Sequence, residues 1–430
     1  MSYYIEKPKI IPILTEVDVL VAGAGPSGVA AAVSAARNGA KTMLLEQSGD
    51  VGGVSTNGLM SHWTGNTKGG IYEEILDRSC DDKSMRTTIN PEKLKLCLLE
   101  LLNEAGVTLQ LYTFASDTIV ENGEVKGIII ESKSGRQAIY SKVVIDATGD
   151  GDIAAKAGAP YFKGRETDGK MQPMTLMFKV GGVNCETALF PPSFETTFPV
   201  PKGDLQSLAR KHLPAPAGHV LLYRSTLPGV VTCNMTNCTE VDGTNAADLT
   251  RATILCRKQI PLIVDFLHEY VPGYEACYLL SSASMIGVRE TRHFEGEKTL
   301  TENDILEARV FDDWAVTKAH FNFDIHNIKG AGLDEHGAQH KFKQNKGYTI
   351  PYGCLVPKKV DGLLLCGRNI SGTHVAHSNF RAMPICANIG QAAGIAAALC
   401  VKTEVKPREL DVKQLQKALK KAGVTLDENE

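Results

Sequence analysis

A short strand, a glycine-rich turn and a helix follow one another near the start of the chain, and this order constrains the fold more than any other feature. Residues 17–22 form a nearly continuous apolar run, which is typical of a strand buried in a parallel sheet. The glycine-rich turn occupies residues 23–28, and residues 29–38 are rich in alanine and helical in propensity. Residues 41–45 predict a second strand, which ends at Glu46. The order is that of a βαβ unit, so we predict an α/β protein with a Rossmann-like domain at its start.

The glycines of this turn have the spacing GxGxxG, and each position has its own physical requirement. Gly23 permits a tight turn, Gly25 lets a pyrophosphate approach the backbone, and Gly28 lets the helix pack closely on the strand. The helix N-terminus offers free N–H groups to the phosphates. The Glu46 carboxylate can accept hydrogen bonds from ribose hydroxyl groups and would repel a 2′-phosphate. The unit therefore predicts a site for an adenine dinucleotide other than NADP. Its residues are Gly23, Gly25, Pro26, Ser27, Gly28, Glu46 and Gln47.

Later segments extend the predicted sheet. Further strands are predicted at residues 117–121, 124–131, 136–140, 142–147 and 363–366. Asn122-Gly123 is a strong hairpin signal, so the first three of these strands are expected to form a three-stranded β-meander. The last two are apolar and are expected to join the parallel sheet. A helix of small residues is predicted at 384–401, and a final amphipathic helix at 412–422.

The segment between these two parts breaks the pattern. Residues from about 160 to 345 mix short strand candidates at 175–180 and 219–223 with a long helical stretch at 247–270. We interpret this segment as an inserted α+β domain that faces the substrate. The predicted domains are a discontinuous nucleotide-binding domain at 1–160 and 345–403, an insertion at 161–344, and a C-terminal helix within 404–430.

Composition argues against several other classes of protein. The formal net charge is only -3, so we expect neither nucleic acid nor a membrane surface as the main partner. The 11 cysteines are scattered without a CxxC pair, which argues against a dithiol reductase or a metal site and favours reduced thiols in the cytoplasm. The longest apolar run near the C-terminus, residues 395–401, is too short to cross a membrane, and residues 1–13 do not resemble a signal peptide.

Several other short motifs occur in the order found in a known family. They lie at residues 52–53, 148–150, 287–292, 350–352, 355–358, 366–371, 374–381 and 390–394. With them, the chain resembles the FAD-dependent oxidoreductases of the glutathione-reductase-like superfamily. Within that superfamily it is most similar to the branch related to succinate dehydrogenase and fumarate reductase flavoproteins. The resemblance implies that the dinucleotide is FAD.

The resemblance also implies where FAD is held. Beyond the βαβ unit, the implied residues are Gly52, Gly53, Thr148, Gly149, Asp150, Gly367, Arg368, Ile385 and Gly390. The helix that begins near Ile385 would direct its N–H groups at the N1–C2 edge of the flavin, where the reduced ring carries negative charge. Gly367-Arg368 stands where the fumarate reductase branch has a more acidic pair, so the substrate arginine of that branch is not carried over.

Candidate catalytic residues lie within the insertion and after it. His374, His377 and Arg381 come just before the helix expected at the flavin, where a proton-transfer group would be needed. The two histidines either contact the substrate or only form hydrogen bonds with flavin and backbone. Arg289 and Arg292 would share a face if their segment is helical, and they either hold a carboxylate or polar substrate or tie the insertion to the nucleotide domain.

The expected function is hydride transfer between a small organic substrate, at a CH–OH or CH–CH group, and N5 of the flavin. A FAD-dependent monooxygenase is the alternative enzyme, although the chain has no second nucleotide fingerprint. A non-catalytic flavin-binding scaffold is the alternative outside enzymes. The electron donor or acceptor is unidentified, and homo-oligomer formation is left open.

Overall fold

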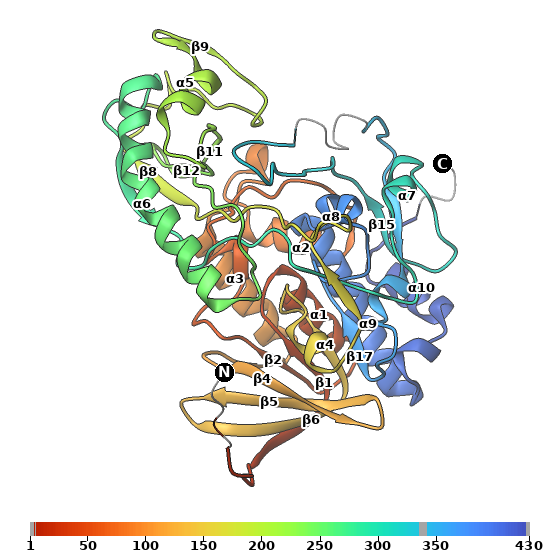
Figure 1. The fold of residues 1–430 in the computed structure, drawn as a ribbon. Helices are drawn as coiled ribbons and strands as arrows, with labels where there is room; N and C mark the ends of the chain where they lie inside the picture. The colour runs from red at the N-terminus through yellow and green to blue at the C-terminus, as the bar shows by residue number, and fades with distance from the viewer. Residues whose placement is uncertain (1–3, 5, 335–341, 427–430) are drawn as a thin grey trace.

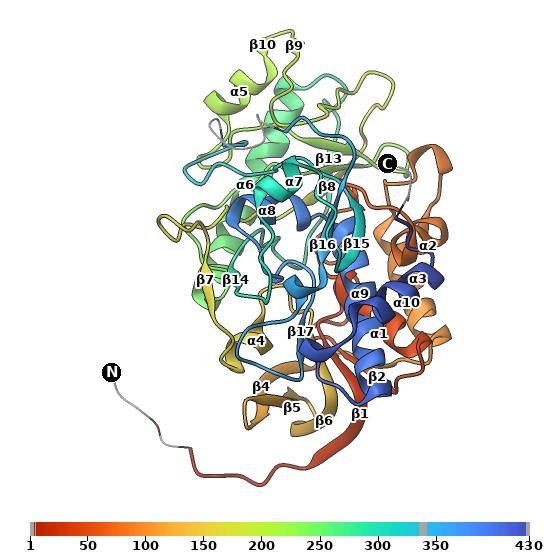
Figure 2. The same ribbon diagram turned by 90° about the vertical axis from the view of Figure 1, so that its right-hand side faces the viewer.

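A computed structural model describes residue 4, residues 6–334 and residues 342–426 (Figure 1, Figure 2). Three parts of the predicted domains lie outside the described residues. They are residues 1–3 and 5 of the first domain, residues 335–341 of the insertion and residues 427–430 of the C-terminal segment.

A mixed seven-stranded sheet forms the centre of the nucleotide-binding part. Its strands lie in the order β3-β2-β1-β6-β5-β4, and β17 pairs with the end of β6. They are β1 (Ile13–Ala22), β2 (Thr42–Leu45), β3 (Thr108–Gln110), β4 (Phe114–Glu121), β5 (Glu124–Ser132), β6 (Gly135–Asp146) and β17 (Leu363–Leu365). Strands β3, β2, β1, β6 and β17 are parallel, whereas β4, β5 and the start of β6 form an antiparallel meander. The predicted α/β class, with a parallel sheet and a three-stranded meander, is confirmed.

Strand β6 differs from the prediction. The sequence predicts two strands, at 136–140 and 142–147, but the structure has one continuous strand. Its first half pairs with β5, its second half pairs with β17, and β1 runs beside it from Ala138 to Asp146. Only Ser141 lies between the two predicted strands. Pairing with β1 keeps the backbone extended through this step, so one strand belongs to both parts of the sheet.

Helices α1 (Pro26–Arg37) and α9 (Met383–Thr403) pack against each other beside the sheet (Figure 2). A Cβ atom on Gly390 would lie 2.1 Å from the carbonyl oxygen of Ser27, so the contact requires glycine at this position. By length and composition α9 could cross a membrane, unlike the short run considered in the sequence. In the fold 89% of its most apolar window is buried, as in the core helix of a globular protein.

The other elements of this part surround the sheet. The helices are α2 (Gly70–Ser79), α3 (Pro91–Glu104), α4 (Asp152–Lys156), α7 (Glu302–Leu306), α8 (His374–Phe380) and α10 (Val412–Lys421). The short strands are β7 (Tyr161–Lys163), which pairs with β14 (Arg292–Phe294), and β15 (Trp314–Ala319), which pairs with β16 (Tyr348–Pro351). The predicted final helix corresponds to α10.

A second apolar cluster lies outside this part of the fold. It contains a four-stranded sheet in the order β11-β12-β8-β13, covered by the long helix α6, which lies apart from the main sheet in Figure 1. The elements are β8 (Phe178–Gly181), β11 (Leu222–Arg224), β12 (Val231–Cys233), β13 (Tyr278–Ser282), α5 (Leu205–His212) and α6 (Ala246–Tyr270), with the small hairpin β9 (Pro199–Val200) and β10 (Gly203–Asp204). Its buried residues come from 174–286, whereas Phe294 to Ile325 pack with the first cluster. The predicted domain limits stay a prediction.

Candidate active site

One cavity of about 650 Å³ connects the glycine-rich turn with the second cluster. Its walls include the turn before α1, the end of β2, residues 147–150 after β6, residues 284–289 and the start of α9. The cavity thus lies at the carboxyl ends of the parallel strands, where open α/β sheets bind their ligands.

The three glycines of the glycine-rich turn have different surroundings: two are tightly packed, and one faces open space. A Cβ on Gly23 would lie 2.5 Å from the carbonyl oxygen of Ala147, and one on Gly28 would lie 1.8 Å from that of Gly23. A Cβ on Gly25 would meet no atom within 4 Å. Gly25 is the N-cap of α1 and Pro26 follows at its first turn, so the open space lies at a helix N-terminus. This arrangement suits a phosphate group.

Glu46 lies at the edge of the same cavity, held by two backbone groups. Its carboxylate accepts hydrogen bonds from the N–H groups of Ala24 (2.8 Å) and Ser48 (2.8 Å). These bonds fix the carboxylate beside the turn, and each oxygen retains acceptor capacity for a hydroxyl group. The position fits the ribose contact expected from the sequence.

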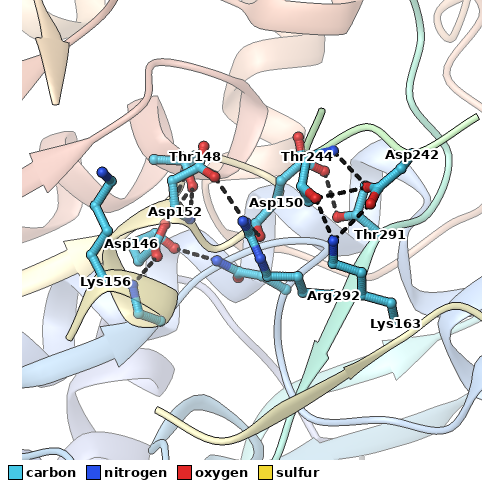
Figure 3. A network of polar contacts seen from close by, with 12 residues as sticks. Asp146, Thr148, Asp150, Asp152, Lys156, Lys163, Asp242, Thr244, Thr291 and Arg292 are labelled. Carbon is cyan, nitrogen blue, oxygen red and sulfur yellow. Dashed lines mark hydrogen bonds and ion pairs between the residues drawn. The ribbon is translucent and has the colours of Figure 1, made fainter. Parts of the chain in front are cut away.

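The loop after β6 is organised by a buried carboxyl group. Asp146 accepts hydrogen bonds from the Thr148 hydroxyl (2.7 Å) and the Ala154 N–H (2.8 Å), as Figure 3 shows for Thr148. Burial raises the pKa of Asp146 to about 6. These bonds hold Thr148, Gly149 and Asp150 against the cavity.

Polar contacts join this loop to residues that are distant in the sequence (Figure 3). Asp150 accepts a hydrogen bond from the Thr291 hydroxyl (2.7 Å) and pairs with Arg368 at 3.0 Å. Arg292 donates to the Asp150 carbonyl (2.7 Å) and to Asp152 (2.8 Å). Of the two roles considered for the arginines, Arg292 therefore has the structural one: it joins the segment at 291–292 to the loop after β6.

Five polar residues form another part of the cavity wall, and we call them the arginine cluster. They are Tyr223, Arg289, Asp324, His326 and Arg381. Arg381 pairs with Asp324 at 2.9 Å, and Asp324 lies 3.4 Å from His326. Arg289 donates from Nη1 to the Pro173 carbonyl (2.6 Å) and to the Thr175 hydroxyl (2.8 Å).

Burial controls the ionisation of this cluster. It lowers the pKa of His326 to about 4, with help from the nearby Arg289 charge, and it raises the pKa of Tyr223 to about 12. Both side chains are therefore neutral near pH 7. Burial alone would raise the pKa of Asp324, but His326 and Arg381 hold it below its usual range. Burial and the neighbouring Arg381 lower the pKa of Arg289 to about 10, which leaves it charged near pH 7.

Residues 18–419 of the chain match the sequence pattern of the family described as FAD dependent oxidoreductase. The chain belongs to this family. FAD is therefore its cofactor, and the protein is an FAD-dependent enzyme. The open space at Gly25 and the carboxylate of Glu46 fit that cofactor.

Curated relatives match about a third of the chain. A thiamine thiazole synthase from Methanococcus vannielii is 31% identical over 151 residues, which are 32% of this chain and 57% of that protein. A digeranylgeranylglycerophospholipid reductase from Methanopyrus kandleri is 27% identical over 162 residues, covering 31% of this chain and 38% of that protein. The chain thus spans about half the length, or less, of these relatives.

Solved structures of similar fold include a geranylgeranyl bacteriochlorophyll reductase-like protein from Thermoplasma acidophilum. It has a TM-score of 0.49 and 14% sequence identity, and the match covers 95% of this chain and 84% of that one.

In this FAD-dependent oxidoreductase, most of the predicted cofactor residues line the cavity. They are Gly23, Gly25, Pro26, Ser27, Glu46, Gln47, Gly53, Thr148, Gly149, Asp150 and Arg368. The predicted residues that do not line it are Gly28, Gly52, Gly367, Ile385 and Gly390. For the glycines the reason is packing: a Cβ on Gly367 would lie 2.6 Å from Ser27 Oγ, and one on Gly52 would lie 2.6 Å from Thr56. Ile385 is buried, while Met383 and Cys386 of the same helix face the cavity.

The predicted catalytic residues separate into two places. Arg289 and Arg381 line the cavity, but His374 and His377 do not. The buried Glu290 accepts hydrogen bonds from His374 Nδ1 (2.5 Å) and His293 Nε2 (2.8 Å). Burial opposes charge on His374, but Glu290 raises its pKa above the ordinary value. This geometry therefore does not support direct contact of the two histidines with a molecule in the cavity.

Two further expectations concern the helical conformation of the Arg289 segment and the absence of a metal site. Residues 287–291 are extended rather than helical, so Arg289 and Arg292 do not share a helix face. Arg289 faces the cavity and Arg292 joins the loop after β6. Glu290, His293 and His377 have ligand atoms within 4.8 Å of one another, so the expectation of no metal site stays a prediction.

Sequence reasoning missed three members of the arginine cluster. Asp324 and His326 alternate in an irregular segment, a spacing that puts both on one side of an extended chain. That alternation was a usable signal, but no strand pattern surrounded it. Tyr223 lies in a predicted strand, yet nothing local distinguishes it from a packing tyrosine.

Proposed function

We propose that this FAD-dependent oxidoreductase transfers a hydride between a small organic substrate and N5 of the flavin, at a CH–OH or CH–CH group. The observation that carries the proposal is that the dinucleotide motif and the arginine cluster line the same cavity. A cofactor held at the motif and a substrate held at the cluster would share one enclosed space. Bound FAD supplies a two-electron acceptor or donor.

The residues of the chain position the reactants. The N-terminus of α1 would hold the diphosphate and Glu46 would hold the adenosine ribose, while the N-terminus of α9 lies at the cavity wall with Ala382 and Met383. Buried apolar side chains of the cavity wall, among them Met177 and Leu221, keep water from the substrate.

We assign the proton transfer to Tyr223. Its hydroxyl keeps its proton near pH 7 because burial raises its pKa, and it lies 3.4 Å from Asn234 Nδ2, which donates to it. Tyr223 would give this proton to the substrate when a C=O or C=C group receives a hydride, and would recover it in the reverse reaction. His374 and His377 are not part of this assignment.

Other finer inferences belong to the same proposal. The motifs at 350–358 and 366–371 support a relationship with succinate dehydrogenase and fumarate reductase flavoproteins in the glutathione-reductase-like superfamily. The free thiols of the 11 cysteines support a cytoplasmic location.

An absorbance spectrum of the purified protein, followed by anaerobic mixing with sugars, hydroxy acids and amines, tests the function. We expect a flavin spectrum that one substrate class bleaches. The reduced protein is then mixed with activated alkenes and ketones to test the reverse direction. A colourless protein that takes up no added FAD, or a flavin that no compound reduces or reoxidises, contradicts the proposal.

Two phenylalanine variants test the role of Tyr223. The Y223F variant is expected to retain FAD and to slow flavin reduction at least about 100-fold, the usual contribution of a proton-transfer group. Y278F removes a hydroxyl from an exposed tyrosine on β13 and is the matched control. Equal rates for Y223F and the wild type would remove the assignment.

A further inference from the structure

Arg289 is the cation of the cavity wall that no described carboxylate neutralises. Its hydrogen bonds go to a backbone carbonyl and to a hydroxyl, both of them neutral, and both use Nη1. The described residues provide no partner for Nε or Nη2. These two donors form the side of a guanidinium that binds a carboxylate through two parallel hydrogen bonds.

The neighbouring residues do not compensate this charge. The carboxylate of the arginine cluster belongs to Asp324, which is already paired with Arg381. His326 is neutral, and so is His219 behind it, where burial lowers the pKa to about 3. With the described residues alone, the cluster therefore carries one positive charge in excess. A buried charge without a counterion is costly, so the site favours an anion.

The remaining charges of the cavity lie with the dinucleotide motif. Arg368 is paired with Asp150, and Glu46 is held by backbone N–H groups. The free N–H groups of α1 suit the diphosphate of FAD. Arg289 lies instead on the segment that leads into β14, beside apolar residues such as Ile286 and Val288. A ligand there would meet one cation and an apolar surface.

We propose that the substrate is an organic carboxylate, which Arg289 binds through Nε and Nη2 while an apolar body lies against Ile286 and Phe321. The proposal rests on the proposed function and names the class of its substrate. Arg381 assists from the other side of the cluster, because its Nε is buried and has no hydrogen-bond partner among the described residues.

The FAD-loaded protein is titrated with benzoate and with benzamide, which have nearly the same shape but differ in charge. Binding is measured from the shift of the flavin absorption bands and from the melting temperature. We expect benzoate to bind at least about tenfold more tightly than benzamide, as one charge-assisted interaction allows. Equal binding, or binding of neither compound, overturns the proposal without the use of any variant.

Variants of Arg289 then locate the anion. R289M is expected to weaken benzoate binding about 100-fold, since it removes one partner of a buried charge pair, while R289K retains part of the affinity. R257M removes an exposed arginine of α6 and is the matched control. Loss of FAD from R289M with unchanged benzoate binding would assign Arg289 to the cofactor and overturn the proposal.

The two proposals fail in different ways. A protein that binds no FAD, or whose flavin is never reduced or reoxidised, contradicts the proposed function. A redox-active FAD protein whose neutral substrates react as well as carboxylates contradicts only the carboxylate inference.

Discussion

Gly25 and Gly28 belong to one turn but meet different surroundings. A Cβ on Gly25 would meet only open cavity space, whereas a Cβ on Gly28 would lie 1.8 Å from the Gly23 carbonyl oxygen. The sequence motif presents both as cofactor residues. In the fold, Gly28 is required before any ligand binds, whereas Gly25 is required only when a phosphate approaches the backbone.

Alanine substitutions separate these two roles. G25A should leave the unfolding free energy of the FAD-free protein within about 1 kcal/mol of the wild type and weaken FAD binding at least about tenfold. G28A should destabilise the FAD-free protein by about 3 kcal/mol because of overpacking. Denaturant unfolding of the FAD-free proteins and FAD titration measure the two effects. Equal FAD affinity of G25A and the wild type would contradict the placement of the diphosphate.

His219 makes stability depend on pH. Burial lowers its folded-state pKa to about 3, compared with about 6.5 for an unfolded histidine, so the unfolded chain binds more protons as the pH falls. The free energy of unfolding is therefore unaffected by His219 above pH 6.5, and it falls below that pH, by about 2 kcal/mol at pH 5. His219 Nε2 donates to the Asn234 carbonyl at 3.1 Å, a bond that glutamine can replace.

H219Q should therefore lose about 2 kcal/mol less than the wild type between pH 7 and pH 5. Urea unfolding at pH 7, 6 and 5 measures this difference. H212Q makes the same exchange at an exposed residue of α5 and is the control. A wild-type slope in H219Q would show that His219 is not held neutral by burial.

At the scale of elements, the contact between α1 and α9 joins residues that are distant in the sequence. Gly390 approaches Ser27, and Gly394 approaches Ala31, each at a distance that excludes a Cβ atom. The sequence shows both glycines within one small-residue helix. It does not show whether they face a cofactor or another helix, and the fold places Gly390 against α1.

G390A should lower the unfolding free energy by about 2 kcal/mol through overpacking, with or without FAD. G330A is the control, because a Cβ on that glycine would meet no atom closer than 3.9 Å. Thermal and urea unfolding measure both variants. A loss of unfolding free energy in G390A that appears only in the presence of FAD would show that Gly390 belongs to the cofactor site.

Most elements with strong local signals were predicted correctly. Asn90 caps α3 through a hydrogen bond from the Glu92 N–H, as its place before Pro91 suggests, and the hairpin at Asn122-Gly123 joins β4 to β5. The division of β6 into two strands was wrong because pairing with distant strands overrides a local polar step.

For the whole molecule, the described fold leaves its cysteines unpaired and buries most of their thiols. Only Cys80 and Cys185 are half-buried, and the other nine of the 11 thiols are buried. Burial raises the pKa of Cys97, Cys238 and Cys277 to about 11, so these thiols are protonated and unreactive near pH 7.

Titration with Ellman's reagent should accordingly show at most two reactive thiols in the native protein. The other nine should react only after unfolding in guanidinium chloride. C80S and C185S together should abolish the native reaction without a change in melting temperature. Rapid reaction of further thiols at pH 7 would contradict the burial of these cysteines.

The amino-acid sequence by itself determined the βαβ unit and the dinucleotide motif, because these depend on residues close together in the chain. It also indicated the FAD-dependent family, through the order of short motifs along the chain. Tertiary structure decided the rest of the active site. Tyr223, Arg289, Asp324 and Arg381 come from segments with no common local pattern, and they meet only because the second cluster folds over the ends of the parallel strands. Their charges and pKa values depend on that burial, a property of the assembled fold that spacing along the chain does not encode.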